Sequence, residues 1–216
     1  MHPINAWRAR AAGFTLLELM VGLTILSITL AVGWPAMTGW LTATRAQAAT
    51  EFYAEGLRMA RGEALKRNVE SRLSLTGNAV SGQFDWQVDI CLPSAGITCR
   101  EATSSWSTVA TPASALVGDT RGADFRSVFR SASALPPATL MTLTRKNGGA
   151  LAVYFTPLGW IDADPALAPF LTQIQIAPAL GHTNAFPTSA VAVTLAGVVS
   201  KCDPSRAVTD SRGCPP

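Results

Sequence analysis

The sequence predicts an α+β protein, in which a long N-terminal helix packs on an antiparallel β-sheet domain made of one sheet or two small ones. Three observations predict this fold. An apolar run extends from Gly13 to Arg45, the next basic residue, and carries a single charge at Glu18. An amphipathic helical stripe continues beyond the run. From Val69 onward the hydrophobic period changes to two, which is typical of strands.

The apolar run predicts that residues 14–41 cross a membrane, since a spanning helix needs about 20 residues. Arg8 and Arg10 precede the run, which predicts a cytoplasmic N-terminus and a C-terminal domain outside the cytoplasm. The alternative is a cleaved secretory signal, with small residues at 46–48 as its cleavage site. Such signals have apolar runs of about 7–15 residues and lack carboxylates, so the presence of Glu18 disfavours this alternative.

The second half of the predicted helix, residues 42–68, carries an apolar stripe at i, i+4, i+7 and i+11: Tyr53, Leu57, Ala60 and Ala64. Glu63 precedes Arg67 by four residues, a favourable helix-surface pair. Pro35 is the one strong helix breaker between Phe14 and Asn68 and should bend the helix without ending it. We therefore expect one helix from about Phe14 to about Arg67.

The remainder, residues 69–216, predicts a β-rich domain. Residues 84–92 alternate, with apolar side chains at the even positions and Asp85, Gln87, Asp89 and Cys91 at the odd ones. Residues 139–155 predict a hairpin that turns at Asn147. Residues 170–177 and 189–199 predict two more strands. Residues 103–120 predict a loop with at most a short strand around Trp106.

The stretch Gly13-Phe14-Thr15-Leu16-Leu17-Glu18 resembles the class III signal of type IV pilins and type II secretion pseudopilins. Basic leader, residue identities, spacing and the following apolar run all agree with that signal. Residues 52–75 are similar to the GspH/FimT group of this superfamily. Cys91, Cys99 and Trp106, with a late cysteine pair near the terminus, resemble minor pilins like FimT and FimU.

This resemblance implies that residues 1–13 are a leader, which a prepilin peptidase cuts after Gly13 before Phe14 is N-methylated. It also implies that the new amine and the Glu18 carboxylate neutralise each other between neighbouring subunits. A carboxylate in hydrocarbon costs about 3 kcal/mol, and pairing lowers that cost. The alternative is a protonated Glu18 that snorkels to the interface. Pro35 falls where such pilins often carry a bending proline, although the bend can equally serve packing alone.

The function implied is that of a minor pilin or pseudopilin that initiates or regulates assembly of a pilus or type II secretion pseudopilus. Its partners would be other pilins, bundled through residues 14–41, the prepilin peptidase and inner-membrane lipid. We expect a single-pass bacterial inner-membrane protein with a periplasmic domain, which becomes extracellular in a filament. The pilin resemblance implies no cofactor.

The alternative function is that of a FimT-like receptor for DNA uptake, which would depend on basic residues near the C-terminus. Its candidate contacts are Lys201, Arg206 and Arg212, which Asp203 and Asp210 offset. Residues 197–201 lack the arginines of the Gly-Arg-x-Arg patch that such receptors share. The net charge of +3 falls to +1 without the two leader arginines. Scattered cations supply little phosphate affinity, so a solvated tail is favoured over DNA binding.

The cysteines and histidines predict structure rather than catalysis. Four cysteines admit three pairings, of which the local one, Cys91 with Cys99 and Cys202 with Cys214, closes the shortest loops. Close C-x2-C pairs are absent, which disfavours a metal site. His182 is expected in a solvated loop without a nucleophile motif, so we expect no enzyme.

Overall fold

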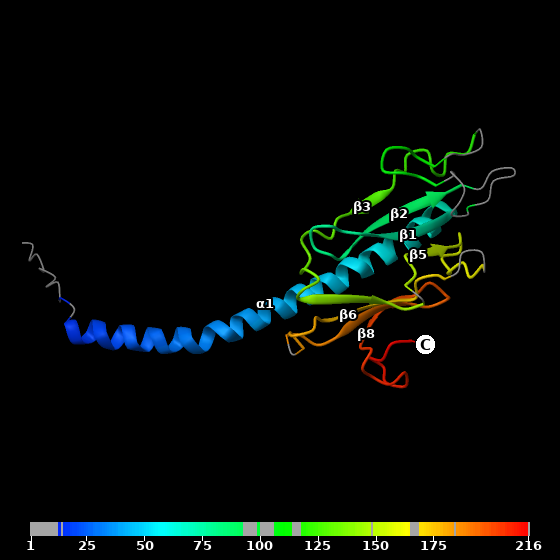
Figure 1. The fold of residues 1–216 in the computed structure, drawn as a ribbon. Coiled ribbons are helices and arrows are strands. Elements are labelled where there is room, and N and C mark those ends of the chain that lie inside the picture. The colour runs from blue at the N-terminus through cyan, green and yellow to red at the C-terminus, as the bar shows by residue number, and fades with distance from the viewer. Residues whose placement is uncertain are drawn as a thin grey trace, which may run out of the picture. The chain divides into compact units, whose positions relative to one another are not determined.

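The computed structural model describes residues 13, 15–92, 99, 106–113, 118–147, 149–164, 169–183 and 185–215, without the side chains at positions 35 and 36. The chain divides into two compact units, Met1–Leu41 and Thr42–Pro216. Within these described residues, one helix is followed by eight strands (Figure 1): α1 (Leu16–Arg67), β1 (Glu70–Gly77), β2 (Phe84–Cys91), β3 (Val128–Arg130), β4 (Met141–Arg145), β5 (Ala152–Phe155), β6 (Gln173–Pro178), β7 (Ser189–Val193) and β8 (Val199–Cys202).

The long helix confirms the predicted element and its C-terminal end. The predicted stripe is fully buried, from Tyr53 through Leu57 to Ala64. The helix ends because Asn68 adopts a left-handed conformation with φ of 52°, and the Val69 amide then donates to the Ala64 carbonyl. α1 continues through position 35, so the proline does not end it. The bend at Pro35 stays a prediction, since that side chain is not described.

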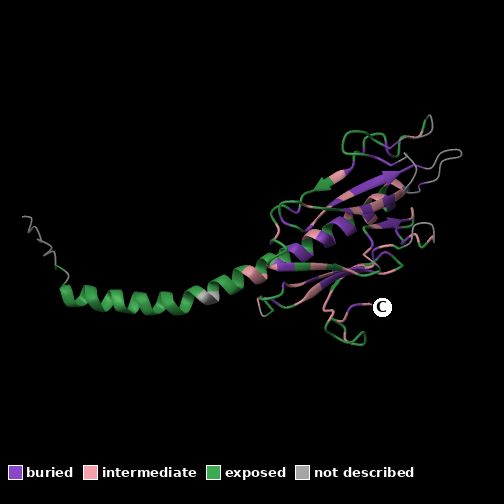
Figure 2. Ribbon diagram, viewed as in Figure 1, coloured by how far each residue is buried: buried purple, intermediate pink, exposed green. Residues whose placement is uncertain are grey.

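Two four-stranded sheets share the core with the second half of α1, and every pair of strands is antiparallel. The first sheet has the order β3-β2-β1-β5 and the second the order β4-β6-β7-β8. Their inner side chains join those of the helix in one cluster, which includes Trp86, Leu73, Phe155, Ile174 and Ile176. Figure 2 shows the buried face of the helix between these strands. The predicted α+β fold, with two small sheets, is confirmed.

The predicted hairpin over residues 139–155 is wrong. Its turn exists, because Asn147 and Gly149 have φ values of 68° and 79°. However, β4 pairs with β6 in one sheet, whereas β5 pairs with β1 in the other. The turn therefore carries the chain from one sheet to the other. The contact between β5 and β1 begins one residue before β5, where the Leu75 amide donates to the Leu151 carbonyl at 2.7 Å.

The single strand predicted over residues 189–199 is also wrong, because this segment contains the turn between β7 and β8. Gly197 has a φ of 74° and donates its amide to the Thr194 carbonyl at 2.7 Å. The strands on either side pair antiparallel, with Val193 opposite Val199. Leu195 and Val198 are exposed at this turn, so their apolar character concealed it in the sequence.

The outer face of β2 is buried at its C-terminal end. Asp89 and Cys91 lie beneath a small cluster made with Cys99, Trp106 and Tyr154. Trp106 forms an isolated antiparallel bridge with Cys91, which agrees with the short strand expected there. The even-numbered residues of β2 thus face the core as predicted. The opposite face, which carries Asp89 and Cys91, is covered by other residues rather than exposed to solvent.

Candidate functional site

Glu18 is part of a hydrogen-bonded cap at the start of α1. The Glu18 amide donates to the Thr15 hydroxyl at 3.2 Å, and the Thr15 amide and hydroxyl donate to Glu18 Oε2 at 3.4 and 3.3 Å. This reciprocal arrangement is a capping box, in which residue and spacing follow the pattern Thr-x-x-Glu. Sequence reasoning missed the role of Thr15, although that four-residue pattern could have revealed it.

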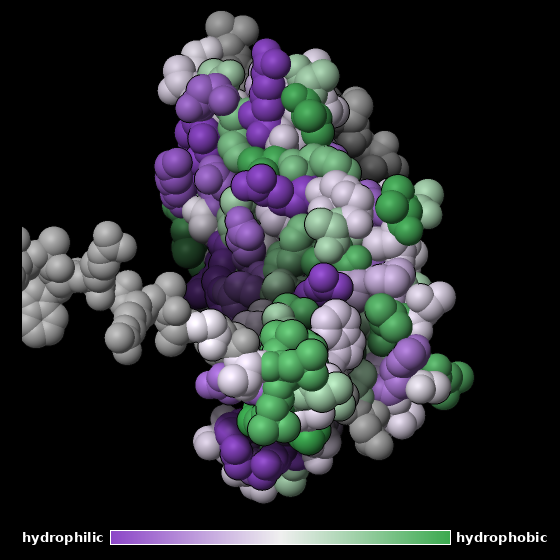
Figure 3. Space-filling view, turned by 90° about the vertical axis from the view of Figure 1, so that its left-hand side faces the viewer, coloured by the Kyte–Doolittle hydropathy of each residue, from purple (hydrophilic) through white to green (hydrophobic). Residues whose placement is uncertain are grey.

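The half of α1 that follows the cap exposes its apolar side chains on every side. Each described side chain from residue 16 to residue 41 is exposed. By length and composition the helix could cross a membrane. Figure 3 shows hydrophobic side chains, in green, gathered at the lower middle of the face that it presents.

Hydroxyl groups within this half are satisfied by the helix itself. Thr24 donates to the Val21 carbonyl at 2.8 Å, and Ser27 donates to the Leu23 carbonyl at 2.7 Å. Thr29 bonds in the same way to the preceding turn. Because these polar groups already have partners, they add little to the cost of an apolar environment.

The other residues predicted for assembly are placed less completely. Gly13 is exposed, whereas Phe14 lies outside the described residues. The pairing of a Phe14 amine with Glu18 is therefore not seen, and in this single chain the carboxylate is held by Thr15. Pro35 lies within α1, well separated along the helix from Glu18.

Comparison with known proteins addresses this same segment. The prokaryotic N-terminal methylation motif matches residues 8–34. Residues 8–34 therefore carry this methylation motif. The match ends before the β domain begins, and no curated protein matches the chain. Among solved structures, the chain is similar to the type IV minor pilin FimU of Pseudomonas aeruginosa, with 14% identity, a TM-score of 0.38, and coverage of 74% of this chain and 94% of that one.

The three cations proposed for DNA contact all lie in ion pairs. Lys201 Nζ lies 2.7 Å from Glu51 Oε2, and the other oxygen of that carboxylate forms an ion pair with Arg58. The hydrogen bond from Lys201, and then that from Arg58, holds the pKa of Glu51 below its ordinary value. Arg206 contacts Asp203 and Asp210, and Arg212 lies 3.8 Å from Asp210. Arg206 and Arg212 share the Asp210 carboxylate, whereas Lys201 pairs with Glu51 on α1.

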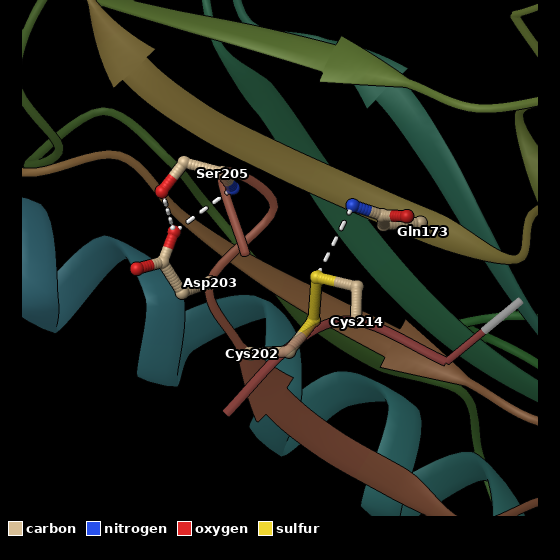
Figure 4. The surroundings of a disulfide bond; sticks show 5 residues. All are labelled: Gln173, Cys202, Asp203, Ser205 and Cys214. Carbon is tan, nitrogen blue, oxygen red and sulfur yellow. Dashed lines mark hydrogen bonds between the residues drawn. A yellow bond between two sulfur atoms is a disulfide. The ribbon is translucent and has the colours of Figure 1, made fainter. Parts of the chain in front are cut away.

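The C-terminal tail is closed by a disulfide between Cys202 and Cys214, whose Cα atoms lie 4.8 Å apart. Figure 4 shows Gln173 on β6 donating through Nε2 to Cys214 Sγ at 3.5 Å. Asp203 accepts from the Ser205 amide and hydroxyl at 2.9 and 2.6 Å, which orders the first turn of the loop and lowers the pKa of Asp203. The tail is thus fastened to the second sheet.

The other disulfide joins Cys91 to Cys99, with Cα atoms 5.8 Å apart, over the outer face of β2. Beneath it, Arg72 Nε donates to the fully buried Asp89 carboxylate at 2.8 Å, and the guanidinium lies 4.5 Å from the centre of the Trp106 ring. Gln87 donates to the second carboxylate oxygen at 2.7 Å. Peptide mapping without reduction would check both cysteine pairs.

Arg61 holds together two turns from different sheets. Its Nε donates to the Gly159 carbonyl at 3.1 Å, and Nη2 donates to the Ala196 carbonyl at 3.4 Å. Gly159 and Gly197 have φ values of 73° and 74°, and a side chain on Gly197 would collide with the Gly159 carbonyl. The two turns approach this closely because position 197 is glycine, whereas a side chain on Gly159 would meet Leu65 of α1 instead.

The described residues contain no group of three or more His, Cys, Asp or Glu side chains that could hold a metal. His182 lies exposed in the loop after β6, where its amide donates to the Ala179 carbonyl at 2.9 Å. The candidate site is the capped, apolar first half of α1.

Proposed function

We propose that this chain is a minor pilin or pseudopilin of the GspH/FimT type. Prepilin peptidase removes residues 1–13, and the subunit enters a pilus or type II secretion pseudopilus through residues 14–41. One observation carries the proposal. The methylation motif extends to residue 34, within a helix half whose described side chains are all exposed, so the apolar surface of that half finds its partners outside the chain.

In this proposal Glu18 sets the axial position of neighbouring subunits during assembly, which we call the register. It is the only charge between Gly13 and Arg45, and a neighbouring subunit could offer it the methylated amine of Phe14. In a low-dielectric bundle such a pair is favourable only at one axial position, because a displaced neighbour leaves both charges unpaired. The local bond to Thr15 satisfies Glu18 until that partner arrives.

Maturation is tested by Gly13→Val, since a branched side chain would block the peptidase from the scissile bond. We expect the membrane-extracted variant to keep residues 1–13, as read from its intact mass. Gly22→Val is the matched control, because a Cβ at Gly22 meets no atom within 4 Å. A Gly13→Val chain that still loses its leader would contradict the proposal.

Assembly is tested by Glu18→Ala. The variant should insert and be processed, since loss of a charge eases insertion. It should nevertheless be missing from sheared filaments, because the partner amine loses its counter-ion. Glu55→Ala, which removes an exposed carboxylate from the second half of α1, is the control and should assemble normally. Equal recovery of both variants in filaments would refute the register.

A role in DNA uptake is less well supported, because Lys201, Arg206 and Arg212 are already neutralised by carboxylates. We expect the detergent-solubilised chain to bind duplex DNA no better than roughly 10⁻⁴ M at physiological salt. Micromolar binding that disappears when these three residues become alanine would favour the receptor instead.

A further inference from the structure

Two tryptophans stand at one end of the apolar half of α1. Trp34 and Trp40 are 70% and 65% exposed, and no charged residue lies between Glu18 and Arg45. A tryptophan ring combines a large apolar surface with one N–H donor. Such rings collect where hydrocarbon meets the headgroups, because the ring is then sheltered while the N–H stays wet.

We propose that Trp34 and Trp40 anchor the helix in the lipid headgroup interface and thereby fix its depth in the bilayer. This inference rests on the membrane segment of the proposed function and adds the position of that segment. The two rings would lie among the lipid headgroups of the leaflet farther from the leader. Trp34 lies at the hydrocarbon side of this layer and Trp40 at its headgroup side.

Helix geometry carries the proposal. Position 37, midway between the two rings, lies 19 residues beyond Glu18, which is roughly 29 Å at 1.5 Å per residue. The hydrocarbon core of a bilayer is about 30 Å thick. With the rings at one boundary, Glu18 therefore lies at the opposite boundary. Gly13 then lies on the water side of Glu18, where a peptidase reaches it.

Composition alone does not fix this depth. The uncharged run from Leu19 to Thr44 would be roughly 39 Å long as a helix, about 9 Å more than the hydrocarbon core. A helix of this length can slide or tilt at small cost. Sliding toward the leader side would carry Glu18 out of the bilayer. Sliding the other way would carry it into the hydrocarbon. The two rings remove this freedom, because each prefers the interface.

Depth is measured on the full chain in phosphatidylcholine and phosphatidylglycerol vesicles that contain lipids brominated near the headgroup or near the chain end. The fluorescence lost on Trp34→Leu or Trp40→Leu reports each ring by difference. Trp160→Leu is the control, since Trp160 is exposed in the β domain. We expect shallow bromines to quench both anchor rings at least twofold more than deep ones.

Stronger quenching by the deep bromines would overturn the anchor and leave the membrane segment intact. A chain that stays outside the vesicles would overturn the membrane segment, and with it the proposed function. The two failures are therefore distinguishable in one experiment.

The consequence for maturation is measured in cells by pulse labelling. We expect Trp34→Leu/Trp40→Leu to lose its leader several-fold more slowly, because Glu18 and Gly13 no longer hold one depth. Trp34→Tyr/Trp40→Tyr should restore the rate, since tyrosine shares the interfacial preference. Trp160→Leu should mature normally. Equal rates for the leucine and tyrosine pairs would overturn the proposal.

Discussion

The two halves of α1 belong to one continuous helix and have opposite surroundings. In the first half every described side chain is exposed, whereas the second half buries a continuous stripe against two sheets. Leu26 is 52% exposed and Leu57 is 1% exposed, although both are leucines in one helix. Burial therefore depends on the partner that each half finds, since leucine favours burial in both.

This contrast shows how one helix serves two purposes. The second half stabilises its own domain through packing and through fixed contacts such as that of Tyr53 with Phe84. The first half leaves its apolar surface for other molecules, which in our proposal are lipids and then neighbouring subunits. A substitution should accordingly affect folding in one half and assembly in the other.

The largest expected effect comes from a leucine pair. Leu57→Ala should lower the free energy of unfolding by about 2–5 kcal/mol, because it leaves a cavity among well-packed side chains. Leu26→Ala, in the first half, should leave the unfolding of the β domain unchanged. Urea unfolding of the detergent-solubilised chain, followed by near-ultraviolet circular dichroism, measures both. Similar losses for the two variants would break the contrast.

A glycine pair gives the next effect. A Cβ on Gly56 would lie 2.6 Å from Leu73 Cδ1 and 2.9 Å from the Trp86 ring, so Gly56→Ala should destabilise the domain by about 1–3 kcal/mol. Gly62 has no atom within 4 Å of such a Cβ, and Gly62→Ala should stabilise the helix by up to about 1 kcal/mol. Opposite signs in the same urea measurement would sharpen the comparison; a shared sign would contradict it.

Tyr53→Phe tests the fastening of helix to strand. The Tyr53 hydroxyl donates to the Phe84 carbonyl at 2.9 Å and accepts from the Phe84 amide at 3.2 Å. Its loss should cost about 1.5 kcal/mol, since both backbone groups lose a partner.

Burial also raises the pKa of Tyr53 well above its ordinary value, so this phenol should ionise only as the domain unfolds in alkali. An absorbance titration that shows ionisation of a folded Tyr53 would refute its burial.

The smallest effect concerns Glu51, whose pKa is lowered chiefly by Lys201 and then by Arg58. A lowered folded-state pKa stabilises the domain above the ordinary value of 4.5, and this stability is lost as the pH falls through the folded pKa. Glu51→Gln should therefore lower the urea midpoint slightly at pH 7 and not at pH 3. Because the pair is exposed, added salt should shrink the difference. A difference that grows in acid would be inconsistent with this pair.

Much of the fold could be predicted from periodicity. The stripe from Tyr53 to Ala64 is buried as its pattern indicates, and so are the apolar positions of β2 from Trp86 onward. The pair of Glu63 with Arg67 is also present, at 2.7 Å. These features are local, so the spacing of a few neighbouring residues is sufficient to predict them.

The errors concern which strands become partners. Turn residues at Asn147 and Gly149 predict a reversal of the chain, but they carry no information about the sheet that the next strand joins. β5 joins β1 because the edge of that strand is open to it. The turn at Gly197 was hidden by exposed apolar neighbours. At the candidate site, Glu18 and the apolar run were evident, whereas the cap by Thr15 was missed in favour of the intermolecular pair.

The contact of Arg61 with two turns has a mechanical consequence. One guanidinium on α1 is bonded to the turn after β5 and to the turn between β7 and β8. A pull applied along the helix would reach both sheets through this side chain together with the packed stripe. Separate contacts would then have to break at once rather than in succession. Resistance to such a force depends on the rate of unfolding rather than on equilibrium stability, so Arg61 would lengthen the time that the stretched domain stays folded.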